Sequence, residues 1–92
     1  MANTTYNTVT VAASATAVVG GSSARKGMLI VNLSETVTVY VGPDTSITTA
    51  NALPILPLAT MSLSGYAEAW KGPVYAIVAT GTLDLRYWEW GQ

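Results

Sequence analysis

The sequence of 92 residues contains no cysteine and no histidine. Without cysteine there can be no disulfide and no thiolate metal site, so a domain this small has to be held together by packing or by assembly. Without either residue type, the most common general base, the strongest nucleophile and the usual transition-metal ligands are all missing. We therefore expect no metal site and no cofactor, and any catalysis would depend on carboxylates.

Charged residues are scarce as well, at 10% of the chain against about 25% in ordinary globular domains, while 50% of the residues are hydrophobic. Such a chain has little polar surface with which to stay monomeric, and we expect a homo-oligomer. The net charge is -1, and the four basic residues form no cluster that could neutralise several phosphates. Nucleic acid is not expected as a partner. The basic residues are Arg25, Lys26, Lys71 and Arg86.

Targeting and membrane signals are not apparent in the sequence. The first residues, MANTTYNTVTV, have neither the basic region nor the apolar core of a signal peptide. No apolar run approaches the roughly 20 residues of a membrane-spanning helix. We expect no membrane partner and, from the length, a single domain over residues 1–92.

The five carboxylates are spread one to a segment, and no two are spaced to meet by local geometry. Two of them could converge in space, as in glycosidases, but Asp44 follows Gly42-Pro43 and is typical of a turn. Residues 20–27, GGSSARKG, do not fit the phosphate-loop pattern, and a predicted strand follows them instead of a helix. We predict that the protein is not an enzyme. The carboxylates are Glu35, Asp44, Glu68, Asp84 and Glu89.

Apolar residues recur at every second position in three parts of the chain, which predicts strands with one buried face. Valines alternate with threonine or tyrosine in residues 8–11 and 36–41, and leucines alternate with polar residues in 82–86. Turn residues separate shorter apolar runs at 15–19, 28–33, 60–64, 66–70 and 74–79. About eight short strands and no helix predict an all-β fold, either an antiparallel β-sandwich or a jelly-roll-like barrel.

Two segments break this pattern. Residues 1–6 are predicted to form an N-terminal arm. Residues 45–59 are predicted to form a long loop, because Pro54 and Pro57 cannot donate to a sheet ladder. The apolar side chains of this loop are expected to close one end of the core or, alternatively, to meet a neighbouring molecule. They are Leu53, Ile55, Leu56 and Leu58.

The chain closes on LDLRYWEWGQ, residues 83–92, which holds two of the three tryptophans. Because side chains alternate along a strand, one face of this segment is predicted to be core and the other to have no certain partner inside the chain. A strand that changes sheets at a bend would instead turn the tryptophans inward, but an interface is the preferred interpretation. The core face holds Leu83, Leu85 and Tyr87, and the candidate interface face holds Asp84, Arg86, Trp88 and Trp90.

Arg25 and Lys26 lie just before the predicted strand 28–33 and complete the candidate interface. Positive charges at this place would keep a sheet end from pairing wrongly. Alternatively, they would contact an acidic surface on a partner.

Three segments resemble small virion proteins of tailed bacteriophages: ARKGMLIVNLSETVTVYVG, then the loop TTANALPI, then GPVYAIVATGTLDLRYWEW. The resemblance spans roughly residues 24–90, with departures at Ala52, at Leu58-Ala59 and in the tryptophan-rich end. It implies a small β-sandwich on the virion, made in the cytoplasm of a bacterial host. The favoured role is a capsid decoration or cement protein that binds the major capsid protein, as a trimer.

Two other functions remain open. One is a component of the tail fibre or baseplate of the virion. The other is a carbohydrate-binding, lectin-like module, in which Trp88, Trp90 and Trp70 would stack against sugar rings. Sugar-binding aromatics need polar groups beside them. Glu89 is predicted to project away from Trp88 and Trp90, which weakens the second alternative, although Asp84 and Arg86 share the face of the two tryptophans.

Overall fold

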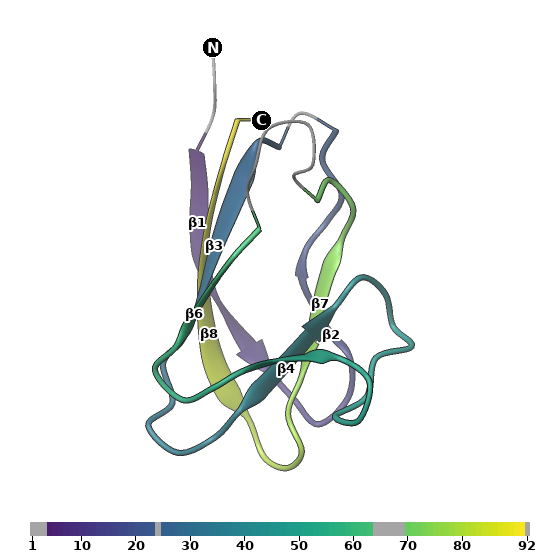
Figure 1. The fold of residues 1–92 in the computed structure, drawn as a ribbon, viewed down its shortest axis with the longest axis vertical. Coiled ribbons are helices and arrows are strands. Elements are labelled where there is room, and N and C mark those ends of the chain that lie inside the picture. Colours follow the sequence, from purple (N-terminus) through teal and green to yellow (C-terminus); the bar gives the residue numbers. More distant parts are fainter. Residues whose placement is uncertain (1–3, 24, 64–69, 92) are drawn as a thin grey trace.

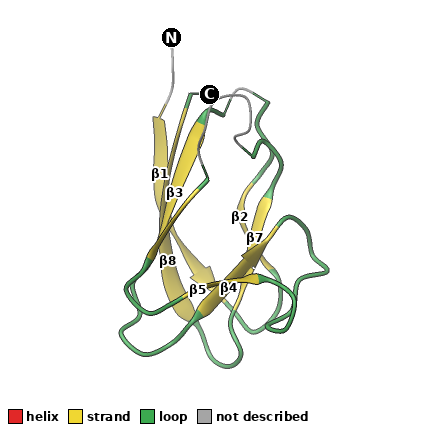
Figure 2. Ribbon diagram, in the orientation of Figure 1, coloured by secondary structure: helices red, strands yellow, loops and turns green. Residues whose placement is uncertain are grey.

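The computed structural model describes residues 4–23, 25–63 and 70–91. Its strands form two four-stranded sheets that face each other as the layers of a sandwich (Figure 1). All the strand pairs are antiparallel, and the described residues contain no helix (Figure 2). The predicted all-β sandwich is therefore confirmed. The strands are β1 (Thr4–Val11), β2 (Thr16–Val19), β3 (Gly27–Asn32), β4 (Val39–Gly42), β5 (Leu53–Ile55), β6 (Thr60–Ser62), β7 (Val74–Ile77) and β8 (Leu83–Trp90).

The strand order is β1-β8-β3-β6 in one sheet and β2-β7-β4-β5 in the other. Strands that follow each other in the chain lie in different sheets, except for β4 and β5, which are neighbours in the second sheet. This is the order of an eight-stranded jelly roll. The chain thus crosses repeatedly between the layers, so each sheet is built from strands far apart in sequence.

The core lies between the sheets, where the inward-facing side chains of both layers meet. In β8 the burial alternates, with Leu83 and Leu85 buried and the residues after each of them exposed. In β3 the same alternation buries Met28 and Ile30. The predicted alternation of buried and exposed residues is therefore confirmed in these strands, because a strand in a two-layer fold packs only one face against the core. The other buried members of the core are Val11, Val18, Val19, Val39, Val41, Ile55, Val74, Ala76 and Val78.

The N-terminal arm predicted for residues 1–6 is wrong for residues 4–6. These residues belong to β1, which pairs with β8 without a break from Thr4 opposite Trp90 to Val11 opposite Leu83. The long β8 offers β1 a ladder along its whole length, and threonine and tyrosine suit a half-exposed strand. Residues 1–3 lie outside the described part of the chain, as do all but Trp70 of the strand predicted at 66–70.

The long loop predicted for residues 45–59 contains the short strand β5. This strand lies at the edge of its sheet, where Pro54 faces Tyr40 of β4 and need not donate to a ladder. Of the loop's four candidate core residues only Ile55 is buried. The three leucines are at least 60% exposed, so they do not close the core of this molecule.

Asn32, at the end of β3, fastens this loop. Its buried Nδ2 donates to the carbonyl oxygens of Val37 at 2.8 Å and Ile55 at 2.9 Å, and to that of Leu56 at 3.2 Å. Its Oδ1 accepts from the backbone N–H of Ser34. One amide side chain therefore replaces the backbone partners that an irregular segment lacks.

Candidate functional site

The outer face of the β1-β8-β3-β6 sheet carries an exposed row of large side chains. The strand register places Tyr6, Trp88 and Leu29 opposite one another on three adjacent strands. Tyr6 is 78% exposed and Trp88 52% exposed, while Leu29 is half-buried. Opposite residues on one face of a sheet contact each other, so these three form a continuous apolar strip, which we call the aromatic row.

Trp90 lies on the same face but is half-buried against its own sheet. Its indole occupies the space above Gly27, where an added Cβ would lie 2.2 Å from Cζ2 of the ring. The ring also meets Trp88 nearly edge-on, with centroids 6.2 Å apart and planes inclined by 72°. Edge-to-face pairs of this kind contribute about 1 kcal/mol beyond their buried area. Trp90 therefore supports Trp88, and of these two tryptophans Trp88 is the one presented to solvent.

The same face becomes polar toward the other end of β8. Asp84 and Arg86 are exposed, and Thr10 donates from Oγ1 to Oδ1 of Asp84 at 3.3 Å. Within the described ranges no ion pair joins Asp84 to Arg86, although both side chains project from one face. The structure thus brings Asp84, Arg86, Trp88 and Trp90 together, as the alternation predicted.

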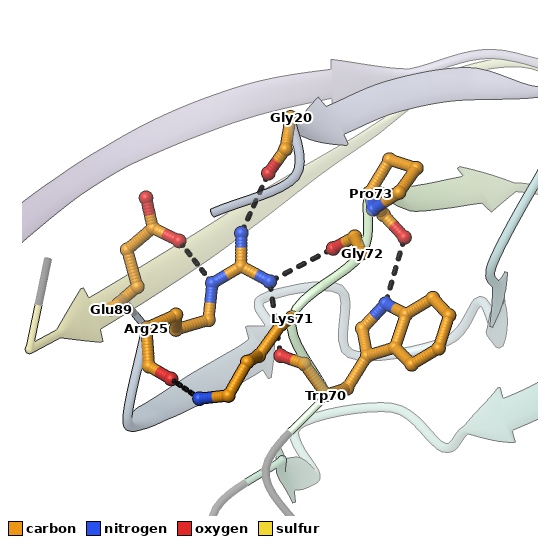
Figure 3. Close-up of polar contacts among 7 residues, drawn as sticks. All are labelled: Gly20, Arg25, Trp70, Lys71, Gly72, Pro73 and Glu89. Carbon is orange, nitrogen blue, oxygen red and sulfur yellow. Dashed lines mark hydrogen bonds and ion pairs between the residues drawn. The ribbon is translucent and has the colours of Figure 1, made fainter. Parts of the chain in front are cut away.

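Arg25 was a candidate for contact with a partner, and the structure corrects this. Its side chain is fully buried, and Figure 3 shows its guanidinium group between Glu89, Gly20 and Gly72. Nε donates to Oε2 of Glu89 at 2.7 Å, and Nη2 donates to the carbonyl of Gly20 at 2.6 Å. Nη1 donates to the carbonyls of Gly72 at 2.9 Å and Trp70 at 3.2 Å. Arg25 has no side-chain surface to offer a partner.

The Arg25–Glu89 pair ties together three segments that are distant in sequence. They are the turn after β2, the approach to β7 and the end of β8, and Lys71 adds a hydrogen bond from Nζ to the carbonyl of Arg25 at 2.5 Å. Glu89 itself is only 7% exposed. A sequence signal for this pair exists, because Glu89 falls on the inward phase of β8 and a buried carboxylate requires a cation.

Lys26, the other basic candidate, is exposed. Its backbone N–H donates to the carbonyl of Trp90 at 2.9 Å, which places it beside the end of β8.

Burial raises the pKa of Tyr87, on the inward side of β8, above its ordinary value of 10.0, and the nearby Glu89 carboxylate acts in the same direction.

Tyr6 and Leu29 are members of the surface that the sequence did not single out. The arm predicted for residues 1–6 includes Tyr6, although Tyr6 continues the alternating run of Thr8 and Thr10 two residues earlier. Leu29 lies in the apolar run at 28–33, for which the sequence does not predict which side chains face outward. Only the pairing of β1 and β3 with β8 shows that both residues flank Trp88.

Two hollows lie in different parts of the molecule. A shallow one of about 370 Å³ wraps around the β1 edge and is lined by Tyr6, Asn7, Thr8, Arg86 and Tyr87. An apolar one of about 240 Å³ opens between the layers, with Leu53, Met61 and Trp70 among its lining residues. In the described ranges, no group of three or more acidic side chains is placed to hold a metal ion. No helix there is long and apolar enough to cross a membrane.

Comparisons with known proteins give a likeness of fold. No family model and no curated protein matches the sequence. A solved structure from Bacillus endospore appendages, which form a family of disulfide-linked pili, is similar with a TM-score of 0.51. The two chains share 12% identity over 100% of this chain and 87% of the other. At that identity the likeness shows the fold alone.

Proposed function

We propose that this chain is a structural protein of a bacteriophage virion, a capsid decoration protein that binds the major capsid protein and stabilises the shell. The observation that carries the proposal is Trp88, which is 52% exposed between Tyr6 and Leu29 on an open sheet face. Contiguous exposed apolar strips rimmed by polar residues mark protein contacts. The resemblance in residues 24–90 supplies the class of partner.

The chemistry of the face fits a protein partner. Tryptophan and tyrosine dominate the binding energy of many interfaces because they bury large areas and lose little conformational freedom. Asp84 and Arg86 lie at the polar end of the face, where exposed charges set orientation more than affinity. The pilus protein of similar fold belongs to a disulfide-linked assembly. This chain has no cysteine, so its own assembly contacts cannot be disulfides.

The test is co-sedimentation with empty shells assembled from the major capsid protein of the source phage. We expect wild-type chain to pellet with the shells and Trp88→Ala to bind at least about 30-fold more weakly, the effect of losing a hot spot of about 2 kcal/mol. Trp70→Ala is the matched control, since Trp70 is similarly exposed, at 43%, but lies off this face. Equal binding by Trp88→Ala and wild type would contradict the proposal, and so would no binding by either. A chain that binds purified tails instead of shells would be a tail-fibre or baseplate component.

Carbohydrate binding is a second candidate, favoured by the hollow of about 370 Å³ beside Tyr6. There an exposed aromatic ring lies next to the polar groups of Asn7 and Arg86, the combination that sugar-binding sites need. A panel of neutral oligosaccharides, followed by the chemical shifts of Tyr6 and Arg86, tests it. Saturable shifts confined to these residues would support the second candidate. Unchanged spectra at millimolar sugar would eliminate it.

A further inference from the structure

The four edge strands of the sandwich are not equally protected against pairing with another chain. Exposed edges invite such pairing, and proteins discourage it with short strands, prolines, charges or bulges. β5 and β6 have three residues each, and β5 contains Pro54. β2 has four residues and a break in register between Ala17 and Val19. β1 has eight residues, an unbroken register, no proline and no charge.

The direction of the backbone groups in β1 follows from the neighbouring ladders. The carbonyl of Trp90 accepts from the backbone N–H of Lys26, so this even residue of β8 directs its backbone groups toward the β3 side. The register pairs the even residues of β8 with the odd residues of β3. Because successive residues of a strand direct their N–H and C=O groups to opposite sides, the odd residues of β8 bond to β1. Their partners in β1 are odd-numbered too. The even residues of β1 therefore turn their N–H and C=O groups outward.

Two hydrogen bonds agree with this assignment. The N–H of Thr8 donates to Oδ1 of Asn7 at 2.8 Å, at an exposed position that a ladder bond to β8 would not permit. The carbonyl of Ala12, the next even residue after the strand, accepts from the N–H of Val78, the residue after β7. Within the described part of the chain, no backbone hydrogen bond joins β1 to any strand other than β8. The outward groups of Tyr6, Thr8 and Thr10 thus form a ready template.

We propose that β1 pairs antiparallel with β1 of a second copy of this chain, about a two-fold axis, to form one eight-stranded sheet from two molecules. The other edges of a second copy are too short or too irregular to match eight residues, so β1 is the edge that fits itself. Its sequence, TTYNTVTV, carries no charge, so two copies meet without repulsion. A two-fold contact of this kind is self-complementary and closes as a dimer.

The even residues of β1 are Thr4, Tyr6, Thr8 and Thr10. The register that overlaps all four sets the two-fold axis beside Asn7. Tyr6 of one copy then lies opposite Thr8 of the second copy. The carbonyl of Tyr6 in each copy replaces Oδ1 of Asn7 as the acceptor for the Thr8 N–H of the other copy. The two outer faces become continuous, so the aromatic rows of both copies lie on one surface. The pairing does not depend on what that surface binds.

The chain offers a closely matched pair of test variants. Thr8 and Thr60 lie in one row across the sheet, as Thr8 opposite Arg86, Arg86 opposite Val31 and Val31 opposite Thr60. Both are exposed on edge strands, and both direct their N–H groups outward, since Ala59 and Leu63 bond to β3. Proline at either position removes an outward N–H without breaking a ladder bond inside the molecule.

The experiment measures mass by light scattering after size-exclusion chromatography, with amide hydrogen exchange by NMR. We expect wild type and Thr60→Pro at twice the 9.6 kDa of one chain, and Thr8→Pro at the mass of one chain. The amides of Tyr6 and Thr10 should exchange slowly in wild type and at least tenfold faster in Thr8→Pro. If Thr8→Pro does not fold, Thr8→Lys with Thr60→Lys as control repeats the test through charge repulsion.

Three results would overturn the pairing. They are a wild-type monomer, a trimer, or an oligomer in which the amides of Tyr6 and Thr10 exchange as fast as in Thr8→Pro. The last would place the contact away from β1. Binding of Thr8→Pro to capsid shells is a separate measurement that depends on Trp88, so the failure of one proposal is distinguishable from the failure of the other.

Discussion

Arg25→Met tests the buried ion pair most severely. Arg25 is fully buried, and Met preserves much of its apolar stem while removing the guanidinium. The substitution leaves the Glu89 carboxylate, 7% exposed, without its counter-charge, and it leaves the carbonyls of Gly20 and Gly72 without a donor. Arg86→Met is the matched control, since it removes the same group from an exposed position on β8, the strand that carries Glu89.

The expected loss is a large part of the total stability. Removing one partner of a buried pair costs about 3–5 kcal/mol. A domain of 92 residues has a free energy of unfolding of about 5–14 kcal/mol. At about 4–8 °C per kcal/mol, Arg25→Met should lower Tm by at least about 12 °C. Arg86→Met should change the free energy of unfolding by less than about 0.5 kcal/mol.

Urea unfolding followed by tryptophan fluorescence measures these values, and a double-variant cycle with Glu89→Leu isolates the coupling. The double variant buries no lone charge, so it should cost about 2 kcal/mol less than the sum of the two single variants. A loss below about 1 kcal/mol in Arg25→Met would refute the reasoning, because it would mean that water reaches the pair. A double variant equal to the sum would refute the coupling.

Three further predictions concern the fold. Gly27→Ala should lower the free energy of unfolding in urea by about 1–3 kcal/mol, because its Cβ would lie 2.2 Å from Trp90. Gly20→Ala, the control, should lower it little, because the space around Gly20 is open. Equal losses would contradict this prediction. Asn32→Ala should lower the free energy of unfolding by about 3 kcal/mol, because three carbonyls lose a hydrogen-bond donor. A loss under about 1 kcal/mol would contradict the role of Asn32 in holding the loop. The raised pKa of Tyr87 means that the folded state keeps this proton after the unfolded state has lost it. Stability should therefore fall as pH rises above 10.0, less steeply in Tyr87→Phe, and identical slopes would refute the assignment.

The fold class could be predicted from the sequence because its main signal is local. Alternation along a strand is decided by neighbouring residues, so the faces of β8 were correct from Leu83 to Trp90. The described residues contain eight strands, as expected, but one of them, β5, lies where the sequence predicts a loop. β5 was not predicted because it contains Pro54. A proline is permitted in an edge strand, but the sequence does not show which strands lie at the edges.

The candidate surface was predictable only in part, because its members come from different strands. Four of its residues share β8 and follow from alternation alone. Tyr6 and Leu29 join them through the pairing of β1 and β3 with β8, which no local pattern contains. Arg25 was misplaced for the same reason. Its partner Glu89 lies 64 residues away, and a basic residue next to a loop is ordinarily exposed.

The most direct measurement of the proposed function is a cryo-electron microscopy reconstruction of the source virion with this protein located in it. We predict that the protein lies on the capsid, with the outer face of the β1-β8-β3-β6 sheet against the major capsid protein and Trp88 in the contact. A particle in which this face points to solvent, or from which the protein is absent, would contradict the proposal.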